Sequence, residues 1–309
     1  NNMNDIKQVS FFMEECRRMG ILVLGPDVNE SLYKFTVNDK GAIRFGMGAV
    51  KGVGRAAVET IVAHRQEKPY KSIFDLTQRI DLRAANKKSF ESLILAGGLD
   101  SLSDAHRSQY FHHNGDGVAF VEKALKYGAQ HQENEQSSQV SLFGADAAVT
   151  IATPELPICE PWTALKELKQ EKEVVGIYIS AHPLDDFAPA MKHFCNARLG
   201  VFNDMDALVN KELSFGGMVG EVDHRVSKNG KGWAMFILED FEESYQFKIF
   251  GEEYLKYRHF LVEDNFIHVK ASVREGWLNR ETGKRGGARM QFNAFQLLQD
   301  TLTTSTHKI

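Results

Sequence analysis

The amino-acid sequence predicts an α+β protein with several domains, in which a mostly helical part precedes a part built from β-strands. Three observations support this prediction. Residues 46–128 carry apolar side chains at the spacing of helices. Residues 212–300 alternate apolar with polar side chains between turn-forming residues, as strands do. The chain has 309 residues, of which 43% are hydrophobic and 25% charged, which suffices for two or three domains.

The first 45 residues predict a helix followed by a small β-hairpin. Residues 5–19 read as an amphipathic helix that ends at Gly20. Its apolar side is formed by Ile6, Val9, Phe12, Met13 and Cys16. Residues 21–24 predict a short strand, and residues 33–37 alternate in the pattern of a second strand. The turn at residues 38–41 leads back into a third strand, which completes the hairpin.

The most informative stretch is a four-residue turn that opens directly into a helix. Gly52 and Gly54 accept backbone angles that other residues avoid, and Val53 between them can anchor the turn in the core. The start of the helix presents a row of backbone N–H groups flanked by Lys51 and Arg55. Together these groups suit a phosphate.

Residues 45–50 predict a short first helix before this turn, so the stretch reads as a helix-hairpin-helix. This motif holds the backbone of nucleic acids without reading the bases. The alternative is a glycine-rich helix start that binds nothing. Charge favours phosphate contact, because residues 41–90 hold ten Lys or Arg against four Asp or Glu, a net +6. The whole chain carries −4, so the remainder carries −10.

Residues 82–95 resemble a degenerate copy of the same unit, although they lack the Gly-x-Gly turn. Two units related by pseudo-symmetry would clamp both strands of a duplex. The predicted contacts to duplex DNA are Lys51, Gly52, Val53, Gly54, Arg55, Arg83, Lys87 and Lys88.

Residues 129–161 predict an acidic linker, because they hold five Asp or Glu and no Lys or Arg. Within the linker lies the pentapeptide Gln139, Val140, Ser141, Leu142 and Phe143. An exposed Leu-Phe pair on a polar tether can anchor in an apolar pocket of a partner, with Gln139 as the polar contact. The alternative is that Leu142 and Phe143 cover the protein's own surface.

The last part of the chain predicts three strands, a helix and two strands, which is the order of the OB-fold barrel. The strands are expected at residues 213–226, 233–239, 245–249, 267–273 and 289–298, with the helix at 252–261. In the fourth strand we expect Ile267 and Val269 inside, and His268, Lys270 and Ser272 on the polar side. The candidates for contact with single-stranded DNA are Lys228, Lys231, Trp233, Lys248 and Arg274. Against this interpretation, residues 212–299 hold twelve basic and thirteen acidic side chains.

Metal sites and membrane insertion find little support in the sequence. His106, His112, His113 and Asp116 match no known ligand spacing. The Asp204-Met205-Asp206 triplet reads as a helix cap rather than a metal site. The three cysteines form no Cys-x-x-Cys pair, which fits a reducing cytosol, and no apolar run is long enough to span a bilayer.

Four stretches resemble a known family, the alpha subunits of bacterial DNA polymerase III, which are C-family replicative DNA polymerases. Residues 14–31 are similar to the end of that family's fingers domain. Residues 43–54 and 72–102 resemble its tandem helix-hairpin-helix region, and residues 174–184 resemble its connector to an OB domain. The resemblance covers nearly the whole chain and indicates the C-terminal half of such a subunit. Because the sequence begins with Asn1, we expect an excised fragment.

The resemblance implies a division into six parts. They are residues 1–45 (end of a fingers-like region), 46–128 (tandem helix-hairpin-helix domain), 129–161 (acidic linker), 162–211 (connector), 212–300 (OB-fold domain) and 301–309 (tail).

The resemblance also implies partners. Residues 139–143 fall where the family carries a motif, Gln-x-x-Leu-Phe, for the sliding clamp, its beta subunit. The family's catalytic carboxylates and their Mg²⁺ lie in a palm domain that nothing here matches, so we expect no catalytic residue and no cofactor in this chain. The clamp loader's tau subunit contacts the region after the family's OB domain, of which residues 301–309 are present.

We therefore expect a non-catalytic, cytoplasmic part of a replicative polymerase that binds duplex DNA, the sliding clamp and single-stranded template. Two alternatives stay open. One is a fragment with its own metal-dependent phosphoryl-transfer or hydrolytic site, built on Asp204, Asp206 and the histidines. The other is a structural spacer that binds neither DNA nor clamp.

Overall fold

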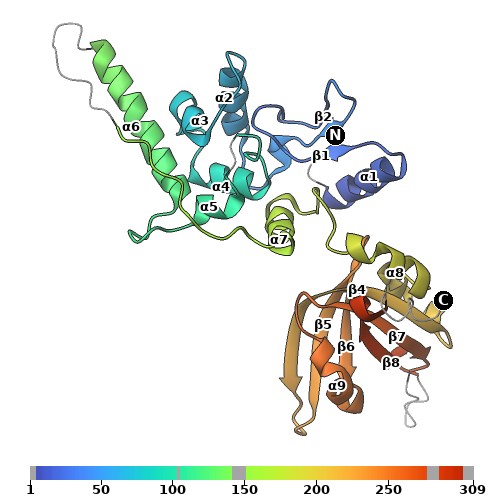
Figure 1. Ribbon diagram of the computed structural model, residues 1–309. Helices are drawn as coiled ribbons and strands as arrows, with labels where there is room; N and C mark the ends of the chain where they lie inside the picture. The colour runs from blue at the N-terminus through green and yellow to red at the C-terminus, as the bar shows by residue number, and fades with distance from the viewer. Residues whose placement is uncertain (1–4, 103–104, 141–150, 277–284, 302–309) are drawn as a thin grey trace. The chain divides into compact units, whose positions relative to one another are not determined.

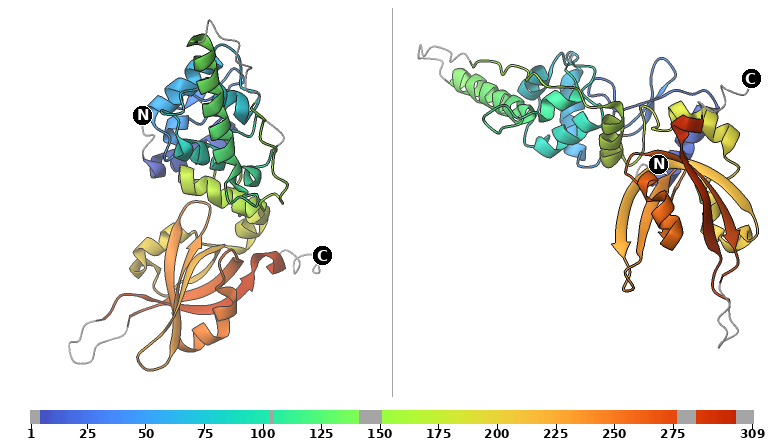
Figure 2. Two further views of the ribbon diagram at one scale, coloured as in Figure 1. Left: turned by 90° about the vertical axis from the view of Figure 1, so that its left-hand side faces the viewer. Right: turned by 60° about the horizontal axis from the view of Figure 1, so that its bottom comes forward.

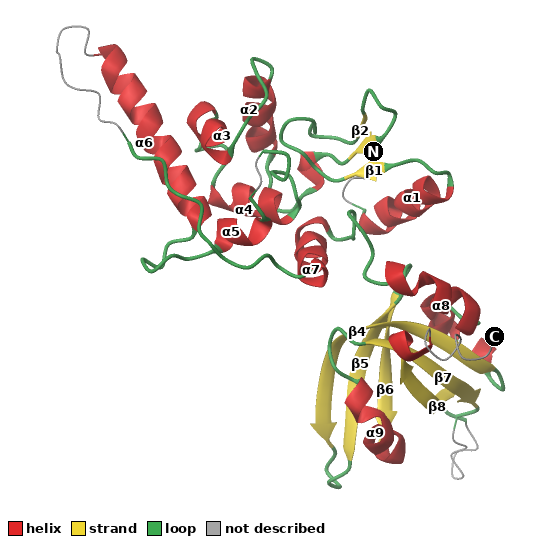
Figure 3. Ribbon diagram, viewed as in Figure 1, coloured by secondary structure: helices red, strands yellow, loops and turns green. Residues whose placement is uncertain are grey.

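The computed structural model describes residues 5–102, 105–140, 151–276 and 285–301. The chain divides into two compact units, Asn1–Ala181 and His182–Ile309. Figure 3 shows that helices dominate the first unit and strands the second. The α+β class is therefore confirmed, and the division falls inside the stretch predicted as a connector, residues 162–211.

The first unit opens with helix α1 (Ile6–Arg18) and a small sheet. Asp5 caps α1 by accepting a hydrogen bond from the Gln8 amide, as expected for an acidic residue before a helix. The sheet consists of β1 (Val23–Leu24), β2 (Thr36–Val37) and β3 (Ile43–Arg44), in the order β1-β3-β2. Strands β2 and β3 are antiparallel, which confirms the predicted hairpin. The predicted apolar side of α1 is wrong at Phe12, which is 55% exposed.

The rest of the first unit is a cluster of helices around one apolar core. These are η1 (Met47–Ala49), α2 (Arg55–Arg65), α3 (Ile73–Arg79), α4 (Lys87–Leu95), α5 (Arg107–Phe111), α6 (Phe120–Val140) and α7 (Ala164–Val175). The core is filled by large side chains from successive elements, including Phe45, Met47, Ile61, Leu76, Phe90 and Phe120. Figure 1 shows α6 alongside α3, and it also contacts α4 and α5.

Helix α6 changes the interpretation of the acidic stretch. Residues 129–140, predicted as the start of a linker, form the second half of this helix. The close approach of α6 to α3 is set at Gly128, where a Cβ atom would lie 2.6 Å from the Thr77 backbone oxygen. The Gln132 side chain donates hydrogen bonds of 2.9 Å to the carbonyls of Thr77 and Ile80. Packing and good helix formers therefore outweigh the polar composition.

Residues 174–179 carry the apolar run Val174, Val175, Ile177 and Ile179, which favours a strand, but these residues, all described, form none. Gly176 ends α7 with a φ of 93°, and the chain then turns back on the helix. The buried Glu171 carboxylate accepts hydrogen bonds from the amides of Ile179 and Ser180. A side chain of the preceding helix thus supplies the partners that a neighbouring strand would have supplied.

The second unit is a five-stranded antiparallel sheet with short helices around it. The helices are η2 (Asp185–Phe187), α8 (Ala188–Phe194), η3 (Leu199–Asp204), η4 (Asp206–Leu208), α9 (Gly251–Tyr257) and η5 (Arg258–Phe260). The strands are β4 (Glu212–Val226), β5 (Gly232–Glu239), β6 (Ser244–Phe250), β7 (Phe266–Arg274) and β8 (Arg289–Leu297). Their order in the sheet is β6-β5-β4-β7-β8.

The succession of strands and helix was predicted correctly, but the closed barrel was not. Within the described residues β6 and β8 are sheet edges and do not pair with each other. Figure 2 shows the sheet strongly curved, with α9 near its concave side. Helix α9 contacts β5 and β6, η5 contacts β8, and the Tyr257 hydroxyl donates to the Asn293 carbonyl. Aromatic side chains from this helical segment therefore fill space that a β6–β8 ladder would close.

Strand β7 also departs from the predicted alternation. His268 and Ser272, expected on a polar face, are only 1% and 3% exposed, whereas Lys270 is exposed as predicted. The end of α8 covers this side, since the Phe194 carbonyl lies 3.2 Å from His268 Nε2. At His268 and Ser272 both faces of the strand are therefore buried, while Lys270 between them reaches solvent.

Candidate nucleic-acid interface

The turn at residues 51–54 is built as the sequence predicts. Gly52 has a φ of 85°, a left-handed conformation that side chains disfavour. Val53 is buried, and its amide donates to the Val50 carbonyl at 3.1 Å. Gly54 is the N-cap of α2 and, among the described residues, no side chain caps this helix.

The open helix start leaves backbone donors available. In the described part of the chain, no hydrogen bond is recorded from the amides of residues 54–57. By contrast, side chains of Asp5, Ser72, Asn86 and Thr163 cap the starts of α1, α3, α4 and α7. The first amides of a helix carry partial positive charge and attract anions. The geometry at the start of α2 therefore suits a phosphate.

Residues of two helices, α4 and α7, form hydrogen bonds with the turn at residues 51–54. From α4, the Ser89 hydroxyl donates to the Gly52 carbonyl at 3.1 Å. From the end of α7, the Val174 carbonyl accepts from the Lys51 amide at 2.8 Å, and the Glu173 carbonyl accepts from Lys51 Nζ at 3.1 Å. The turn is thus fixed by hydrogen bonds from both sides.

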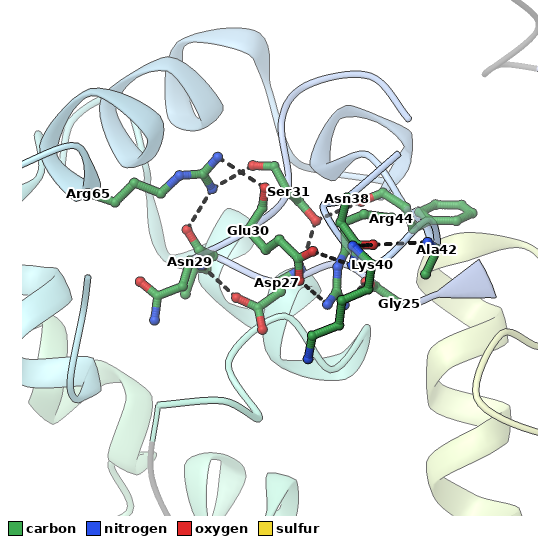
Figure 4. A network of polar contacts seen from close by, with 12 residues as sticks. Gly25, Asp27, Asn29, Glu30, Ser31, Asn38, Lys40, Ala42, Arg44 and Arg65 are labelled. Atoms are coloured by element: carbon green, nitrogen blue, oxygen red, sulfur yellow. Dashed lines mark hydrogen bonds and ion pairs between the residues drawn. The ribbon is translucent and has the colours of Figure 1, made fainter. Parts of the chain in front are cut away.

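The far end of α2 is fastened by Arg65 to the loop before the hairpin (Figure 4). Its guanidinium donates to the carbonyls of Val28, Ser31 and Glu30, at 2.9, 2.6 and 3.2 Å. Burial lowers the pKa of Arg65 from its usual value. In the same network, hydrogen bonds from Asn38 and Arg44 hold the pKa of Glu30 below its ordinary range although burial opposes this. These contacts orient α2 and with it the turn.

The predicted basic residues have different surroundings. Arg55 is exposed, with its guanidinium 4.5 Å from the centre of the Tyr33 ring and 3.8 Å from the Glu59 carboxylate. Lys51 is exposed but engaged at the end of α7. Lys88 is exposed and lies on the α4 face that meets Gly52. The structure therefore gathers Lys51, Arg55 and Lys88 around the turn.

Two further predicted residues are not gathered there. Lys87 is exposed, but its Nζ lies 2.8 Å from the Glu122 carboxylate of α6, and this hydrogen bond raises the pKa of Lys87. Arg83 lies in the link between α3 and α4, and none of the contacts found among the described residues joins it to the first turn.

The link at residues 80–86 is the second turn of the predicted tandem, and side chains of the protein accept from amides of this link and of the helix start that follows it. Asp81 Oδ1 accepts from the Arg83 amide at 2.8 Å, and Asn86 Oδ1 accepts from the Ser89 amide at 3.1 Å. The Asp81 amide donates to Thr60 Oγ1 at 3.0 Å. Where the Gly-x-Gly is missing, the helix that follows is thus capped by a side chain, Asn86, whereas α2 is not.

Sequence reasoning missed the two serines on α4 that face the first turn, Ser89 and Ser92. Both are buried, and Ser92 Oγ lies 3.0 Å from the position of a Cβ atom on Gly52. The available signal was two small polar residues three positions apart on a helix face that is otherwise apolar.

In the second unit, three neighbouring strands present a row of one arginine and two aromatic residues, of which Trp233 is partly buried. Arg225 pairs across the sheet with Trp233, and Trp233 with Phe250. The rings of Trp233 and Phe250 are stacked, with centroids 5.3 Å apart and planes 18° apart. The Arg225 guanidinium lies 5.7 Å from the centre of the Trp233 ring, and Phe250 is 55% exposed.

Four of the five candidates for single-strand contact lie on or near this row, and one does not. Lys228 and Lys231 are exposed in the β4–β5 turn, and Lys248 is exposed on β6, two residues before Phe250. Arg274 follows Ser272, which pairs with Glu212 at the beginning of β4, whereas Arg225 lies near its end. Its Nε donates to Gln291 Oε1 at 3.3 Å.

The candidate metal ligands serve as structural partners. Asp204 Oδ1 accepts from the Ala207 amide at 3.2 Å, and Asp206 Oδ1 accepts from the Ala288 amide at 2.9 Å. His106 Nδ1 lies 2.6 Å from the Ser108 hydroxyl. Among the described residues, no group of three or more His, Cys, Asp or Glu is arranged to hold a metal.

The predicted clamp-binding pentapeptide falls at the edge of the described chain. Gln139 and Val140 belong to the last turn of α6, and Ser141, Leu142 and Phe143 lie outside the described residues. The assignment stays a prediction. None of the described helices has the length and apolar character needed to cross a membrane.

Comparison with known proteins agrees with this geometry. Residues 20–110 match the sequence model of a helix-hairpin-helix motif, which includes the turn at residues 51–54 and helices α2 to α4. DNA polymerase III subunit alpha of Vibrio cholerae is 31% identical over 301 residues, covering 94% of this chain and 25% of the relative. The same subunit of Saccharopolyspora erythraea is 32% identical over 283 residues, covering 89% of this chain and 23% of the relative.

The corresponding subunit of Escherichia coli K12 is 30% identical over 279 residues, covering 88% of this chain and 23% of the relative. The chain thus spans about a quarter of the length of these relatives. Over nearly its whole length it is related to one segment of DNA polymerase III subunit alpha, and it contains a helix-hairpin-helix motif.

Proposed function

We propose that this chain is the part of a replicative DNA polymerase that holds DNA during synthesis, and that it grips the duplex backbone through the turn at residues 51–54. One observation carries the proposal: α2 begins at a glycine, without a side-chain cap, inside the stretch that matches a helix-hairpin-helix. Free amides and nearby cations bind phosphates regardless of sequence. Such a grip suits a polymerase, which must hold every sequence equally well.

The test introduces a carboxylate where the phosphate would bind. Ala56 is exposed in the first turn of α2, so Ala56→Glu places a negative charge at the helix start, where it is tolerated by the fold. We expect duplex affinity to fall about tenfold and the salt dependence of binding to become shallower by about one phosphate contact. Fluorescence anisotropy of a labelled duplex at several salt concentrations measures both.

The matched control is Ala63→Glu, the same substitution at an exposed position of α2 about two turns later. It changes the net charge equally but leaves the helix start open. If both variants weaken binding to the same extent, only overall charge matters and the proposed turn site is wrong.

We also propose that residues 139–143 bind the sliding clamp, the beta subunit of the replicase. The support is the Gln-x-x-Leu-Phe pattern and its place at the end of α6, whose preceding residues 133–137 are polar and exposed. Replacing Leu142 and Phe143 by Ala removes both anchors. Titration calorimetry with purified clamp should then show no measurable binding, and unchanged binding would refute the assignment.

A second DNA contact is favoured by the aromatic row of Arg225, Trp233 and Phe250. We interpret the second unit as an OB-fold that is open between β6 and β8, a barrel type in which outward aromatic residues stack on unpaired bases. Each base stacked on an aromatic ring contributes about 1–3 kcal/mol. Trp233→Ala with Phe250→Ala should therefore weaken oligo-dT binding at least tenfold, while Arg274→Ala, at the other end of β4, should change it little.

A further inference from the structure

The first turn of α4 lies directly against the back of the turn at residues 51–54. A Cβ atom placed on Gly52 would lie 3.0 Å from Ser92 Oγ, 3.3 Å from Lys88 Cγ and 3.5 Å from Lys88 Cε. The aliphatic part of the Lys88 side chain therefore packs along Gly52, and Lys88 as a whole is exposed. Lys88, a cation of the second hairpin, thus lies beside the turn of the first hairpin.

The other cations near this surface have partners within the protein. Lys51 Nζ donates to the Glu173 carbonyl, Arg55 lies between Glu59 and the Tyr33 ring, and Lys87 pairs with Glu122. Lys88 forms no ion pair with any residue in the described part of the chain. Its charge is therefore available to an external anion.

A buried hydroxyl gives a second, independent indication. Ser92 is fully buried, its Oγ has no hydrogen-bond partner among the described residues, and it faces Gly52. Buried polar groups without partners are rare in folded proteins, and a functional role is one of the explanations for them. The α4 face behind the turn thus holds a buried hydroxyl that is unpaired within the described chain.

We propose that Lys88 supplies the cation of the phosphate site formed by the turn at residues 51–54, so that the two hairpins make one composite site. This inference rests on the proposed function of the turn. A composite site differs from the expectation that each hairpin holds one strand of the duplex on its own. The amides come from the first hairpin and the charge from the second, while the Ser89 hydroxyl holds the turn through the Gly52 carbonyl and Ser92 packs against Gly52.

The test compares two adjacent lysines of one helix. Lys88→Ala should lower the slope of log affinity against log salt by about 0.9, the value for one phosphate contact on duplex DNA. Lys87→Ala should lower it less, because this side chain is already paired. Lys126→Ala, an exposed lysine of α6, serves as the control for a loss of one charge. All four proteins are measured by anisotropy with the same duplex, and thermal unfolding verifies that each is folded.

The outcomes separate the two proposals. If Ala56→Glu weakens binding but Lys88→Ala keeps the parental slope, the turn binds phosphate and the assignment of Lys88 is overturned. A slope that falls for Lys87→Ala and not for Lys88→Ala overturns it equally. If the parent protein binds no duplex, both the function and the composite site fail.

Discussion

The two hairpin turns of the first unit differ in which groups occupy their backbone donors. The turn before α2 has four residues, a glycine at φ 85°, and no side-chain cap from the described residues. In the link before α4, the carboxylate of Asp81 and the amide oxygen of Asn86 accept the nearby N–H groups. On the proposed function, the helical arrangement serves an external ligand in its first copy, whereas in its second copy side chains cap the turn.

The strongest test of this difference is Gly52→Val. A side chain at this position meets the left-handed backbone, which costs about 1–2 kcal/mol, and also contacts Ser92 Oγ at 3.0 Å. We expect a clear loss of stability in urea unfolding together with loss of duplex binding. Gly54→Ala is the matched control, since Gly54 has a φ of −79° and no described atom within 4 Å of its Cβ position. Equal stability of the two variants would contradict the assigned role of Gly52.

A smaller effect is expected when the second turn loses its cap. Asn86→Ala removes the oxygen that accepts from the Ser89 amide and should cost about 1 kcal/mol of unfolding free energy. The salt slope of duplex binding should stay at the parental value, because on the composite-site proposal the phosphate binds at the turn before α2. A reduced slope in anisotropy would show that the second turn contacts DNA after all.

The ion pair of Lys87 allows a test in which duplex affinity should rise instead of fall. Glu122→Gln keeps the shape of the side chain but removes the nearer of the two carboxylates that pair with Lys87, leaving Glu91 at 3.7 Å. The less strongly paired ammonium should raise duplex affinity a few-fold and steepen the salt slope by at most about 0.9. Glu133→Gln, an exposed position further along α6, controls for the change in net charge. An unchanged slope in both variants would mean that Lys87 lies too far from the duplex.

The smallest effect is expected in the second unit, at a buried histidine whose polar atoms have partners inside the protein. His268 lies 2.6 Å from the Ser214 hydroxyl and 3.0 Å from Gln296 Nε2, and burial lowers its pKa from 6.5, with Lys270 adding to the shift. The unfolded chain then binds a proton first, so stability is complete above pH 6.5 and falls as the pH decreases through that value. Urea unfolding between pH 7.5 and 5.5 should show this loss, and His268→Gln should reduce it. A pH dependence unchanged by the substitution would assign the effect to other groups.

Local signals allowed the sequence to predict much of this structure. The glycine turn, the start of α2 and the succession of strands in the second unit follow from backbone preferences and alternation, which act within a few residues. The length of α6 did not follow, because its second half is polar and is ordered by contacts with α3, including the bonds from Gln132. Burial of His268 and the open edge at β6 likewise depend on α8 and α9, which meet the sheet only in the folded chain.

The candidate site shows the same limit. Its amides and flanking charges were predictable from residues 51–55, since they lie together in the sequence. The role of Ser92 and the difference between Lys87 and Lys88 could not be predicted. A step of one residue along the helix decides which side chain contacts Gly52 and which contacts Glu122. Adjacent residues of identical type thus have opposite surroundings.

Because Gly128 packs directly against Thr77, the direction of the second half of α6 depends on this contact. About 18 Å of helix extend from this glycine to residue 140, at 1.5 Å per residue. A Cβ atom at Gly128 would press on the α3 backbone at 2.6 Å and tilt the arm. A tilt of about 10° over that length would move its tip by about 3 Å. A single methyl group at Gly128 would therefore displace the end of α6 at Gln139 and Val140.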